Sequence, residues 1–236
     1  MHPLLPALQK GLDDLSLPLT QEQQAQLLAY MDLIGKWTKV YNLTAVRDAN
    51  EMLTHHLLDS LAVIAPLRRE LVKLVRSTLP AYQSLPEQGG ASKVGHPSSS
   101  FSLLDVGAGA GLPGVVIAIA CPEVSVTCVD TVAKKAAFIQ QVAATLRLPN
   151  LKGLHARVET LTQPYDVVCS RAFASLVDFT SWSKSALVDH GVWMAMKGKH
   201  PDQELAVLPE SVKVFHVEQL QVPGLDAERC IIWMRG

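Results

Sequence analysis

The stretch LLDVGAGAGLPG, residues 103–114, decides the fold. Its apolar residues end at a carboxylate, Asp105, and glycines follow at positions 107, 109, 111 and 114. Glycine lacks a Cβ atom, so the backbone can take positive φ and a ligand can approach closely. A buried strand that ends in such a turn and leads into a helix is typical of ligand-binding α/β folds.

Around this stretch, apolar runs that predict strands alternate with helical patterns. The strands are expected at 101–106, 124–130, 151–156, 165–170, 191–197, 211–220 and 229–235, and the helices at 112–120, 133–147 and about 176–187. This alternation predicts a parallel sheet with helices on both faces. The last two strands follow each other without a helix, which predicts a C-terminal hairpin.

The residues before this domain are predicted to be helical. Thr20 begins one helix, with Gln23 in its first turn, and a second pattern runs over 49–67, where Pro66 ends the helix or begins a new turn. We therefore divide the chain into an N-terminal helical extension (1–76), a Pro-, Gly- and Ser-rich linker or surface insertion (77–100), and a ligand-binding domain (101–236).

Composition narrows the class of protein. The 236 residues carry a net charge of −1, which argues against tight, non-specific nucleic-acid binding but leaves room for a local basic patch. The four cysteines lack C-x-x-C spacing, so we expect buried thiols, with neither a zinc site nor disulfides. No apolar run is long enough to span a membrane and no signal peptide is apparent, so we expect a soluble cytoplasmic protein.

The charge of Asp105 bears on the ligand. A carboxylate aimed into the turn would repel a pyrophosphate and attract a cation such as S-adenosylmethionine (SAM), which carries an ammonium and a sulfonium but no phosphate. The alternative is that Asp105 caps the turn or the next helix. Gly109, Gly111 and Gly114 also match the G-x-G-x-x-G pattern, which keeps a nicotinamide-dependent oxidoreductase open as an alternative function.

Two further acids follow the second and third strands. Asp130 ends the second strand, where a carboxylate can accept hydrogen bonds from both ribose hydroxyls of an adenosine ligand. Its alternative role is to cap the helix that begins near Ala133. Glu159 follows the third strand, where the adenine edge would lie, although an ordinary exposed acid is the simpler interpretation.

Several motifs together resemble one family. DVGAGAGLPG, RVE, SRAFASL and MKGK occur in that order, preceded by WTKVYNLTAVRDANEMLTHHLLDSLA and followed by LQVPGLDAERCIIWMR. In these motifs the chain resembles the GidB family of SAM-dependent methyltransferases. The resemblance implies a class I methyltransferase fold, which is Rossmann-like, with a seven-stranded, mostly parallel sheet, an antiparallel C-terminal hairpin and an N-terminal helical extension. It also implies methylation of nitrogen 7 of a guanine in the decoding-region loop of 16S rRNA.

The resemblance assigns roles to individual positions. Matching the family's motifs places Gly107, Leu112, Val158, Glu159 and Arg171 at the SAM site, where Asp105, Gly109 and Asp130 join them. The predicted substrate-binding residues are Arg171, Lys197, His56 and Asn42.

Each of these side chains also has a structural alternative. Arg171 can form an internal salt bridge and Lys197 can be a solvated loop lysine, while His56 and Asn42 can brace the N-terminal helices. Two positions depart from the family pattern: Ala108 replaces a Ser or Thr, and His55 replaces an Arg.

The chemistry and the charge complete the expectation. Nitrogen 7 of guanine carries an in-plane lone pair, so we expect catalysis by positioning, with no catalytic acid or base and no metal. The near-neutral charge predicts modest, salt-sensitive affinity for free RNA, which favours the small ribosomal subunit or an assembly intermediate as the partner of a monomeric enzyme. A non-catalytic SAM-binding ribosome-assembly factor is a further alternative.

Overall fold

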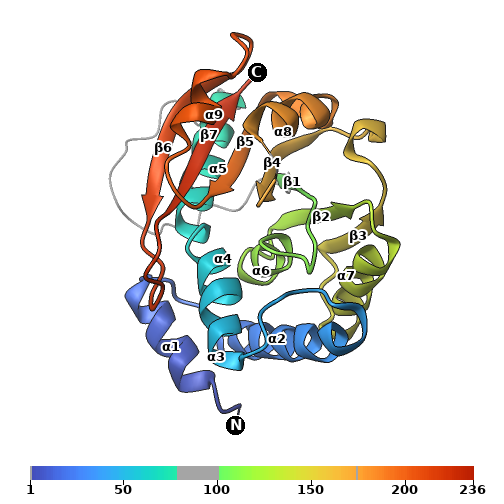
Figure 1. The fold of residues 1–236 in the computed structure, drawn as a ribbon, viewed down its shortest axis with the longest axis vertical. Coiled ribbons are helices and arrows are strands. Elements are labelled where there is room, and N and C mark those ends of the chain that lie inside the picture. Colours follow the sequence, from blue (N-terminus) through green and yellow to red (C-terminus); the bar gives the residue numbers. More distant parts are fainter. Residues whose placement is uncertain (1, 79–100, 174) are drawn as a thin grey trace.

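The computed structural model describes residues 2–78, 101–173 and 175–236. Its centre is a seven-stranded sheet with the order β3-β2-β1-β4-β5-β7-β6 (Figure 1). The strands are β1 (Phe101–Val106), β2 (Val124–Asp130), β3 (Leu151–His155), β4 (Tyr165–Arg171), β5 (Leu187–Lys197), β6 (Lys213–Leu220) and β7 (Arg229–Arg235). The first five are parallel, and β7 is antiparallel to both β5 and β6. The predicted fold class and the C-terminal hairpin are confirmed.

Helices cover both faces of this sheet. The N-terminal part contains α1 (Leu5–Asp14), α2 (Gln21–Tyr41), α3 (Ala49–Met52), the π-helical segment η1 (Leu53–Leu58), α4 (Asp59–Leu61) and α5 (Ile64–Thr78). The sheet's own helices are α6 (Gly114–Ala120), α7 (Ala133–Thr145), α8 (Leu176–Ser183) and α9 (Asp202–Ala206), with 3-10 turns η3 (Val158–Thr160) and η4 (Lys184–Ala186).

Alternate residues of β1 face two different hydrophobic clusters. Leu103 packs into the larger cluster, together with α6, α7 and the N-terminal helices. Leu104 and Val106 pack into the smaller cluster, on the face that α8 covers. Figure 1 shows α2 lying along α6 and α7, so the N-terminal helices form an outer layer on one face of the sheet.

The start of α2 and the start of α5 follow the sequence. Thr20 and Gln23 form a reciprocal capping box, in which each side chain accepts a hydrogen bond from the other's backbone amide. Pro66 lies in the first turn of α5, where its missing amide hydrogen costs no helical hydrogen bond. Of the two alternatives for Pro66, the new turn is confirmed.

Some boundaries differ from the prediction. The predicted second helix is divided into α3, η1, α4 and α5, and the helix after β1 begins at Gly114 instead of residue 112. The glycine turn extends further than predicted, over residues 109–113, and Gly111 within it has φ of +93°. Strand β5 starts at Leu187, and α9 was not predicted, because its five residues include no buried residue that would give an apolar period.

The remaining sequence-level predictions have mixed outcomes. All four cysteines are buried free thiols, as predicted. Within the described ranges, no helix is long and apolar enough to cross a membrane. The predicted linker falls almost entirely on 79–100, outside the described residues, so the proposed domain boundaries stay predictions. The larger hydrophobic cluster runs from Leu8 to Trp233 and therefore joins the N-terminal helices to the sheet.

This shared cluster predicts that the N-terminal helices unfold together with the sheet. Ile34 in α2 is fully buried, so Ile34→Ala should lower the free energy of unfolding by about 2–5 kcal/mol. Chemical denaturation should show one transition, shifted as a whole. The control is Val40→Ala in the same helix, because Val40 is 73% exposed and should change stability by less than about 0.5 kcal/mol. A separate N-terminal transition would contradict this account.

Candidate functional site

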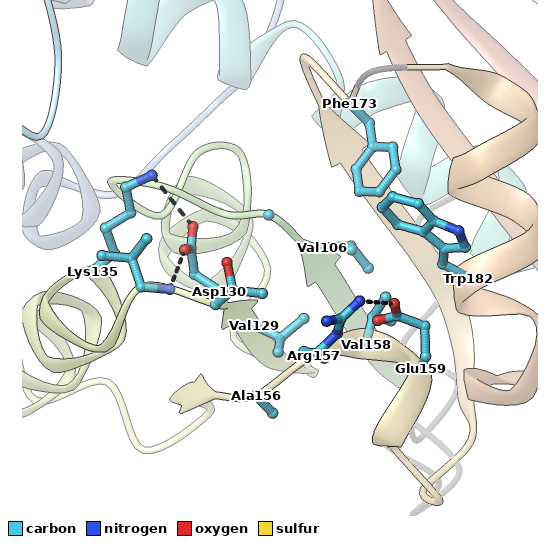
Figure 2. Close-up of a pocket in the computed structure, with 13 residues that line it drawn as sticks. Val106, Val129, Asp130, Lys135, Ala156, Arg157, Val158, Glu159, Phe173 and Trp182 are labelled. Atoms are coloured by element: carbon cyan, nitrogen blue, oxygen red, sulfur yellow. Dashed lines mark hydrogen bonds and ion pairs between the residues drawn. The ribbon is translucent and has the colours of Figure 1, made fainter.

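Two pockets lie at the edge of the sheet where the parallel strands end. The first is formed by the ends of β1, β2 and β3 together with two aromatic side chains (Figure 2). It is lined by Val106, Gly107, Val129, Asp130, Thr131, Val132, Lys135, Ala156, Arg157, Val158, Glu159, Phe173 and Trp182. This is the edge at which α/β sheets bind their ligands.

The first pocket gathers half of the predicted cofactor residues. Gly107, Asp130, Val158 and Glu159 come from three different strand ends and all line it. Val106, Val129 and Val158 give the pocket an apolar component, while the two acids provide hydrogen-bond acceptors near its ends. An apolar cleft with a few fixed polar groups is the usual form of a small-molecule site.

Asp130 serves the backbone as well as the pocket. Its Oδ1 accepts from the amide of Val132 at 2.8 Å, and its Oδ2 accepts from the amide of Gly109 at 3.0 Å. The Lys135 ammonium lies 3.7 Å from Oδ2. The bond to Val132 satisfies the amide of the residue just before α7, but the N-cap position is Val132 itself, so Asp130 is not the N-cap considered as its alternative role. Each carboxylate oxygen has a second lone pair, so a ligand hydroxyl can still be accepted.

Glu159 is more exposed and is held by its neighbour. Arg157 donates to Glu159 Oε1 at 3.0 Å. A backbone hydrogen bond within Glu159 and the bond from Arg157 lower the pKa of this carboxyl group. Glu159 is therefore an ionised acceptor at neutral pH.

Phe173 and Trp182 form an aromatic wall that the sequence interpretation missed. Their ring centroids lie 5.6 Å apart in an edge-to-face arrangement, and the ring centroid of Phe179 lies 5.6 Å from that of Phe173. Trp182 is 44% exposed, which is unusual for so large an apolar side chain. The available signal was weak, because Phe173 lies inside the SRAFASL motif but Trp182 lies nine residues further along, in α8.

Asp105 does not line either pocket, in contrast to its predicted position facing a ligand cation. The side chain is fully buried beneath the turn, and its Oδ2 accepts from the amide of Gly114 at 2.9 Å. The structure thus shows the alternative that the sequence left open, a carboxylate that caps the next helix. Gly109 and Leu112 do not line the pockets either; Gly109 supports the turn through Asp130, and Leu112 is buried in the core.

The burial of Asp105 changes its ionisation. Desolvation, only partly offset by the bond from Gly114 and by the Arg171 cation, raises the pKa of the Asp105 carboxyl group to about 7. The second oxygen, Oδ1, is buried and has no hydrogen-bond partner among the described residues. Asp105 is therefore a poor fixed negative charge at neutral pH.

The second pocket lies at the ends of β4 and β5 and is rich in cationic groups. His55, His56, Asp59, Arg171, Ala172, Met196, Lys197, Gly198 and Arg229 line it. Asp59 is buried and receives two arginines: Arg171 Nη1 donates to Oδ2 at 3.0 Å, and Arg229 Nε donates to Oδ1 at 2.9 Å. Arg171 also donates to the carbonyl of His55 at 3.0 Å. Two cations thus share one carboxylate.

The predicted role of Arg171 is only partly compatible with this arrangement. The internal salt bridge that the sequence left as an alternative is formed, with Asp59 as its partner. Because Arg171 has five N–H donors and uses one nitrogen here, it can still reach an anion in the pocket. Arg229 was not predicted as a site residue, although it lies inside the C-terminal LQVPGLDAERCIIWMR motif.

His56 is buried and neutral. Its Nε2 lies 2.8 Å from the Thr44 hydroxyl, and its Nδ1 has no partner among the described residues. Burial and the nearby Arg171 cation lower the pKa of His56. Asn42 lies outside both pockets: it ends α2 in a left-handed conformation, and its side chain accepts a hydrogen bond from Arg47. The structure does not bring Asn42 to the predicted substrate site.

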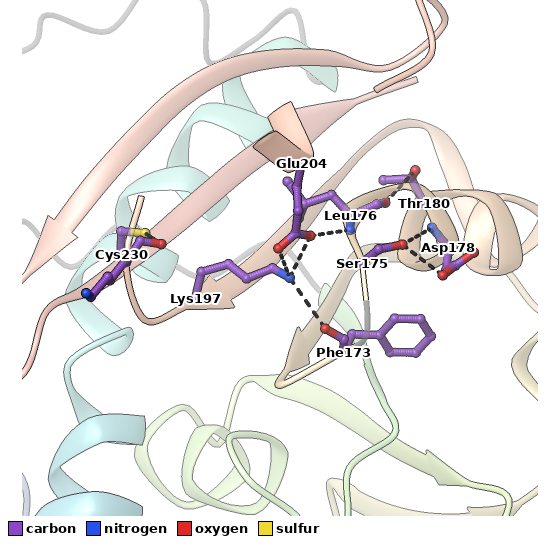
Figure 3. A network of polar contacts seen from close by, with 9 residues as sticks. Phe173, Ser175, Leu176, Asp178, Thr180, Lys197, Glu204 and Cys230 are labelled. Carbon is purple, nitrogen blue, oxygen red and sulfur yellow. Dashed lines mark hydrogen bonds and ion pairs between the residues drawn. The ribbon is translucent and has the colours of Figure 1, made fainter. Parts of the chain in front are cut away.

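Lys197 lines the second pocket but is held by an acid. Its Nζ lies 2.8 and 2.9 Å from the two carboxylate oxygens of Glu204 in α9 and 3.4 Å from the carbonyl of Phe173 (Figure 3). Glu204 also accepts from the amide of Leu176 at 2.7 Å. Neither a free loop lysine nor an open phosphate ligand describes this residue. Glu204 was not predicted as a partner of Lys197, because it belongs to the unpredicted helix α9.

The two pockets are neighbours along the sheet edge. Strands β1 and β4 are paired, and their ends contribute Gly107 to the first pocket and Arg171 to the second. Phe173 lines the first pocket only two residues after Arg171. A ligand in the first pocket can therefore extend toward a second molecule in the other pocket, as a group-transfer reaction requires.

Comparison with known proteins identifies the family. The sequence model of GidB, described as rRNA small subunit methyltransferase G, matches residues 23–75 and 91–232. The chain belongs to the GidB family. A protein of Polaromonas sp. strain JS666 named ribosomal RNA small subunit methyltransferase G is 68% identical over 97% of this chain and 92% of its own length. A protein of Acidovorax ebreus with the same name is 62% identical over 97% of this chain and 94% of its own length.

Membership in the GidB family confirms the resemblance noted in the motifs. The predicted enzyme class, a SAM-dependent methyltransferase, is confirmed with it. Among solved structures, TrmN from Thermus thermophilus matches with a TM-score of 0.48 and 16% identity over 58% of this chain and 44% of that protein. A SAM-dependent methyltransferase from Aquifex aeolicus matches with a TM-score of 0.46 and 15% identity over 57% of this chain and 81% of that protein.

The raised pKa of Asp105 predicts a pH-dependent loss of stability. Between about pH 4 and about pH 7 the folded GidB chain holds a proton that the unfolded chain has released, so its free energy of unfolding falls as the pH rises. Asp105→Asn keeps an acceptor for Gly114 but cannot ionise. The variant should therefore gain stability relative to the native chain, by on the order of a few kcal/mol, as the pH rises through this window. Denaturation at several pH values measures it, and a pH-independent difference would contradict the assignment.

The shared carboxylate of the second pocket predicts a large cost for its removal. Asp59→Asn would leave Arg171 and Arg229 facing each other without their counter-charge, which should lower the free energy of unfolding by about 3 kcal/mol or more. Thermal or chemical denaturation measures the change. Asp189→Asn is the matched control, because Asp189 is exposed and makes no ion pair within the described parts of the chain. Equal free energies of unfolding for the two variants would show that the Asp59 carboxylate does not stabilise the fold.

Proposed function

We propose that this chain transfers the methyl group of SAM to nitrogen 7 of a guanine in the decoding-region loop of 16S rRNA, at position 527. The observation that carries the proposal is the match to GidB over 23–75 and 91–232, together with relatives named for the small-subunit ribosomal RNA. The two adjoining pockets at the sheet edge give this reaction a place.

The first pocket fits the adenosine part of SAM. Each carboxylate oxygen of Asp130 keeps a lone pair for the ribose hydroxyls. The ammonium of Lys135, 3.7 Å from Oδ2, pairs with this carboxylate. Val158 and the other valines offer apolar contact to a purine, while the exposed carboxylate of Glu159 can accept from its exocyclic amine. This assignment places four predicted residues (Gly107, Asp130, Val158 and Glu159) around one ligand.

Asp105, Gly109 and Leu112 act indirectly in this proposal. Asp105 and Gly109 shape the turn through Gly114 and Asp130, and Leu112 anchors it in the core. When bound, SAM supplies a methyl group on a positively charged sulfur. Attraction between that sulfur and Asp105 is limited in this arrangement, because the carboxyl group is buried beneath the turn and its Oδ2 already accepts from the amide of Gly114. The turn's backbone is then the main contact for the donor's central part.

The second pocket fits the target nucleotide. Arg171 and Arg229 can donate to a base oxygen or a phosphate, and the methionine carboxylate of the donor is a further partner for Arg171. Asp59 neutralises one of the two arginines, which limits repulsion when the methylated guanine gains a positive charge. His56 supports the pocket through Thr44, and Lys197 is a substrate ligand only if RNA displaces Glu204.

The chemistry asks the protein for orientation. Guanine nitrogen 7 attacks through an existing lone pair, so no side chain has to remove a proton first. His56 is neutral and buried, and the arginines remain charged, so neither needs to change its protonation during the step. Holding the nitrogen, the methyl carbon and the sulfur in line can supply about 7–11 kcal/mol in favourable cases. The base must leave its stack to enter the pocket.

The surroundings of the reaction are also part of the proposal. The net charge of −1 favours a shaped target, the small ribosomal subunit or an assembly intermediate, over naked RNA. We propose that the enzyme acts in the cytoplasm. We also propose that it acts as a monomer, since one chain contributes both pockets.

Labelled SAM incubated with unmodified small subunits tests this function. The label should enter 16S rRNA at one guanine, located by primer extension or mass spectrometry of nuclease fragments. Labelling should be greater for subunits than for free 16S rRNA, and it should fall as the salt concentration rises. Subunits that already carry the modification are the control and should accept no label.

The alternatives give different results in the same experiment. SAM binding without transfer to any subunit or RNA would indicate a non-catalytic assembly factor. Label on protein or small molecules alone would refute the proposed substrate. The nicotinamide-dependent oxidoreductase, an earlier alternative from the glycine spacing, is not compatible with membership in a methyltransferase family.

A further inference from the structure

Tyr30 connects the N-terminal helices to the glycine turn. It lies in α2, is fully buried, and donates a hydrogen bond from its hydroxyl to the carbonyl of Ala110 at 2.6 Å. Its ring stacks on Phe138 of α7 at a centroid distance of 6.4 Å. The ring of Trp37 also packs on Phe138, with the two centroids 5.3 Å apart. Packing therefore fixes the Tyr30 ring, and the ring in turn positions the hydroxyl that bonds to the turn.

The rest of the turn is bound by the end of β2. The amides of Gly107 and Ala108 donate to the carbonyl of Val129 at 2.9 and 3.2 Å, and the amide of Gly109 donates to Asp130. The bond from Tyr30 to Ala110 is the next one along the chain. Two separate elements, β2 and α2, thus hold successive residues of the turn.

The contact leaves little room for movement. Gly111 adopts a positive φ of +93°, and a Cβ atom there would lie 2.5 Å from the Val115 side chain and 3.3 Å from the Tyr30 hydroxyl oxygen. The turn is packed between the Tyr30 hydroxyl and the first residues of α6. Loss of the hydroxyl would leave the buried carbonyl of Ala110 without its donor and open space beside Gly111.

The hydrogen bonds that the N-terminal helices make to α6 itself reach only its last residues. Gln23 donates to the carbonyl of Ile119, and Arg68 donates to the carbonyl of Ala120, each at 2.8 Å. Among the described residues of α1 to α5, only Tyr30 forms a hydrogen bond with the turn itself. Loss of the Tyr30 bond should therefore affect the turn, whereas loss of the Gln23 or Arg68 bond should affect only the end of α6.

We propose that Tyr30 is a positioning residue for the cofactor: by holding Ala110, it keeps the neighbouring residues Gly107 to Gly109 in the conformation that binds SAM. The N-terminal helices are then a structural part of the cofactor site. The inference rests on the proposed function for the identity of the ligand, and it does not depend on which molecule receives the methyl group.

The test is Tyr30→Phe in the full-length chain, with SAM binding measured by calorimetry. The ring and its packing remain and only the hydroxyl is lost, so the protein should fold. The dissociation constant for SAM should rise about 3- to 10-fold, the range expected when a buried carbonyl loses its donor. Hydrogen exchange at residues 107–112 should accelerate, and the KM for SAM should rise more than kcat falls.

Two variants separate positioning from a merely structural role. Tyr165→Phe removes the hydroxyl of another buried tyrosine, which makes no hydrogen bond within the described residues, and should leave SAM affinity unchanged. Gln23→Ala removes the bond at the far end of α6 together with the side-chain half of the α2 capping box, and it should lower thermal stability without changing SAM affinity. A Tyr30→Phe protein with lower stability but native SAM affinity and native exchange would overturn the inference.

The outcomes also separate this inference from the proposed function. Native protein that binds SAM but methylates no ribosomal RNA would refute the proposed substrate and leave the role of Tyr30 intact. Native protein that binds no SAM would overturn both.

Discussion

The amides of Gly107, Ala108 and Gly109 donate to the last two residues of β2, Val129 and Asp130. This contact fixes the glycine turn against the neighbouring strand, and the first pocket forms along the line where they meet. Asp130 accepts from Gly109 in the turn and from Val132 just before α7, so two hydrogen bonds fix the carboxylate that lines the first pocket. A ligand that binds here meets a backbone already in place, which reduces the entropy lost on binding.

Buried charges organise the second pocket in a similar way. Asp59 joins Arg171, 112 positions further along the chain, to Arg229 at the start of β7. The α4 segment and two strands are therefore connected through one carboxylate. The Lys197–Glu204 pair plays a comparable part between β5 and α9, and it also holds the amide at the start of α8. Both pockets depend on contacts between segments that are distant in the sequence.

This distribution explains which features the sequence could predict. Strand positions, the Thr20 cap and the glycine turn depend on local patterns, and they were predicted with errors of a few residues. The position and ionisation of the Asp105 carboxyl group were not predictable from its spacing. Both depend on its burial in the folded chain and on the hydrogen bond from the amide of Gly114. Phe173 and Arg229 lie inside quoted motifs, but their roles in the pockets depend on residues that are distant in the sequence, Trp182 for Phe173 and Asp59 for Arg229, so the motifs alone did not mark them.

We propose that the donor's adenosine lies in the first pocket and that its methyl-bearing sulfur faces the second. A crystal structure of the protein with S-adenosylhomocysteine, the demethylated donor, tests it most directly. We predict ribose hydroxyls at hydrogen-bond distance from Asp130, the adenine between Val158 and the neighbouring valines, and the sulfur on the side of Arg171. A ligand bound elsewhere, or one whose sulfur points away from Arg171, would refute this placement of the donor.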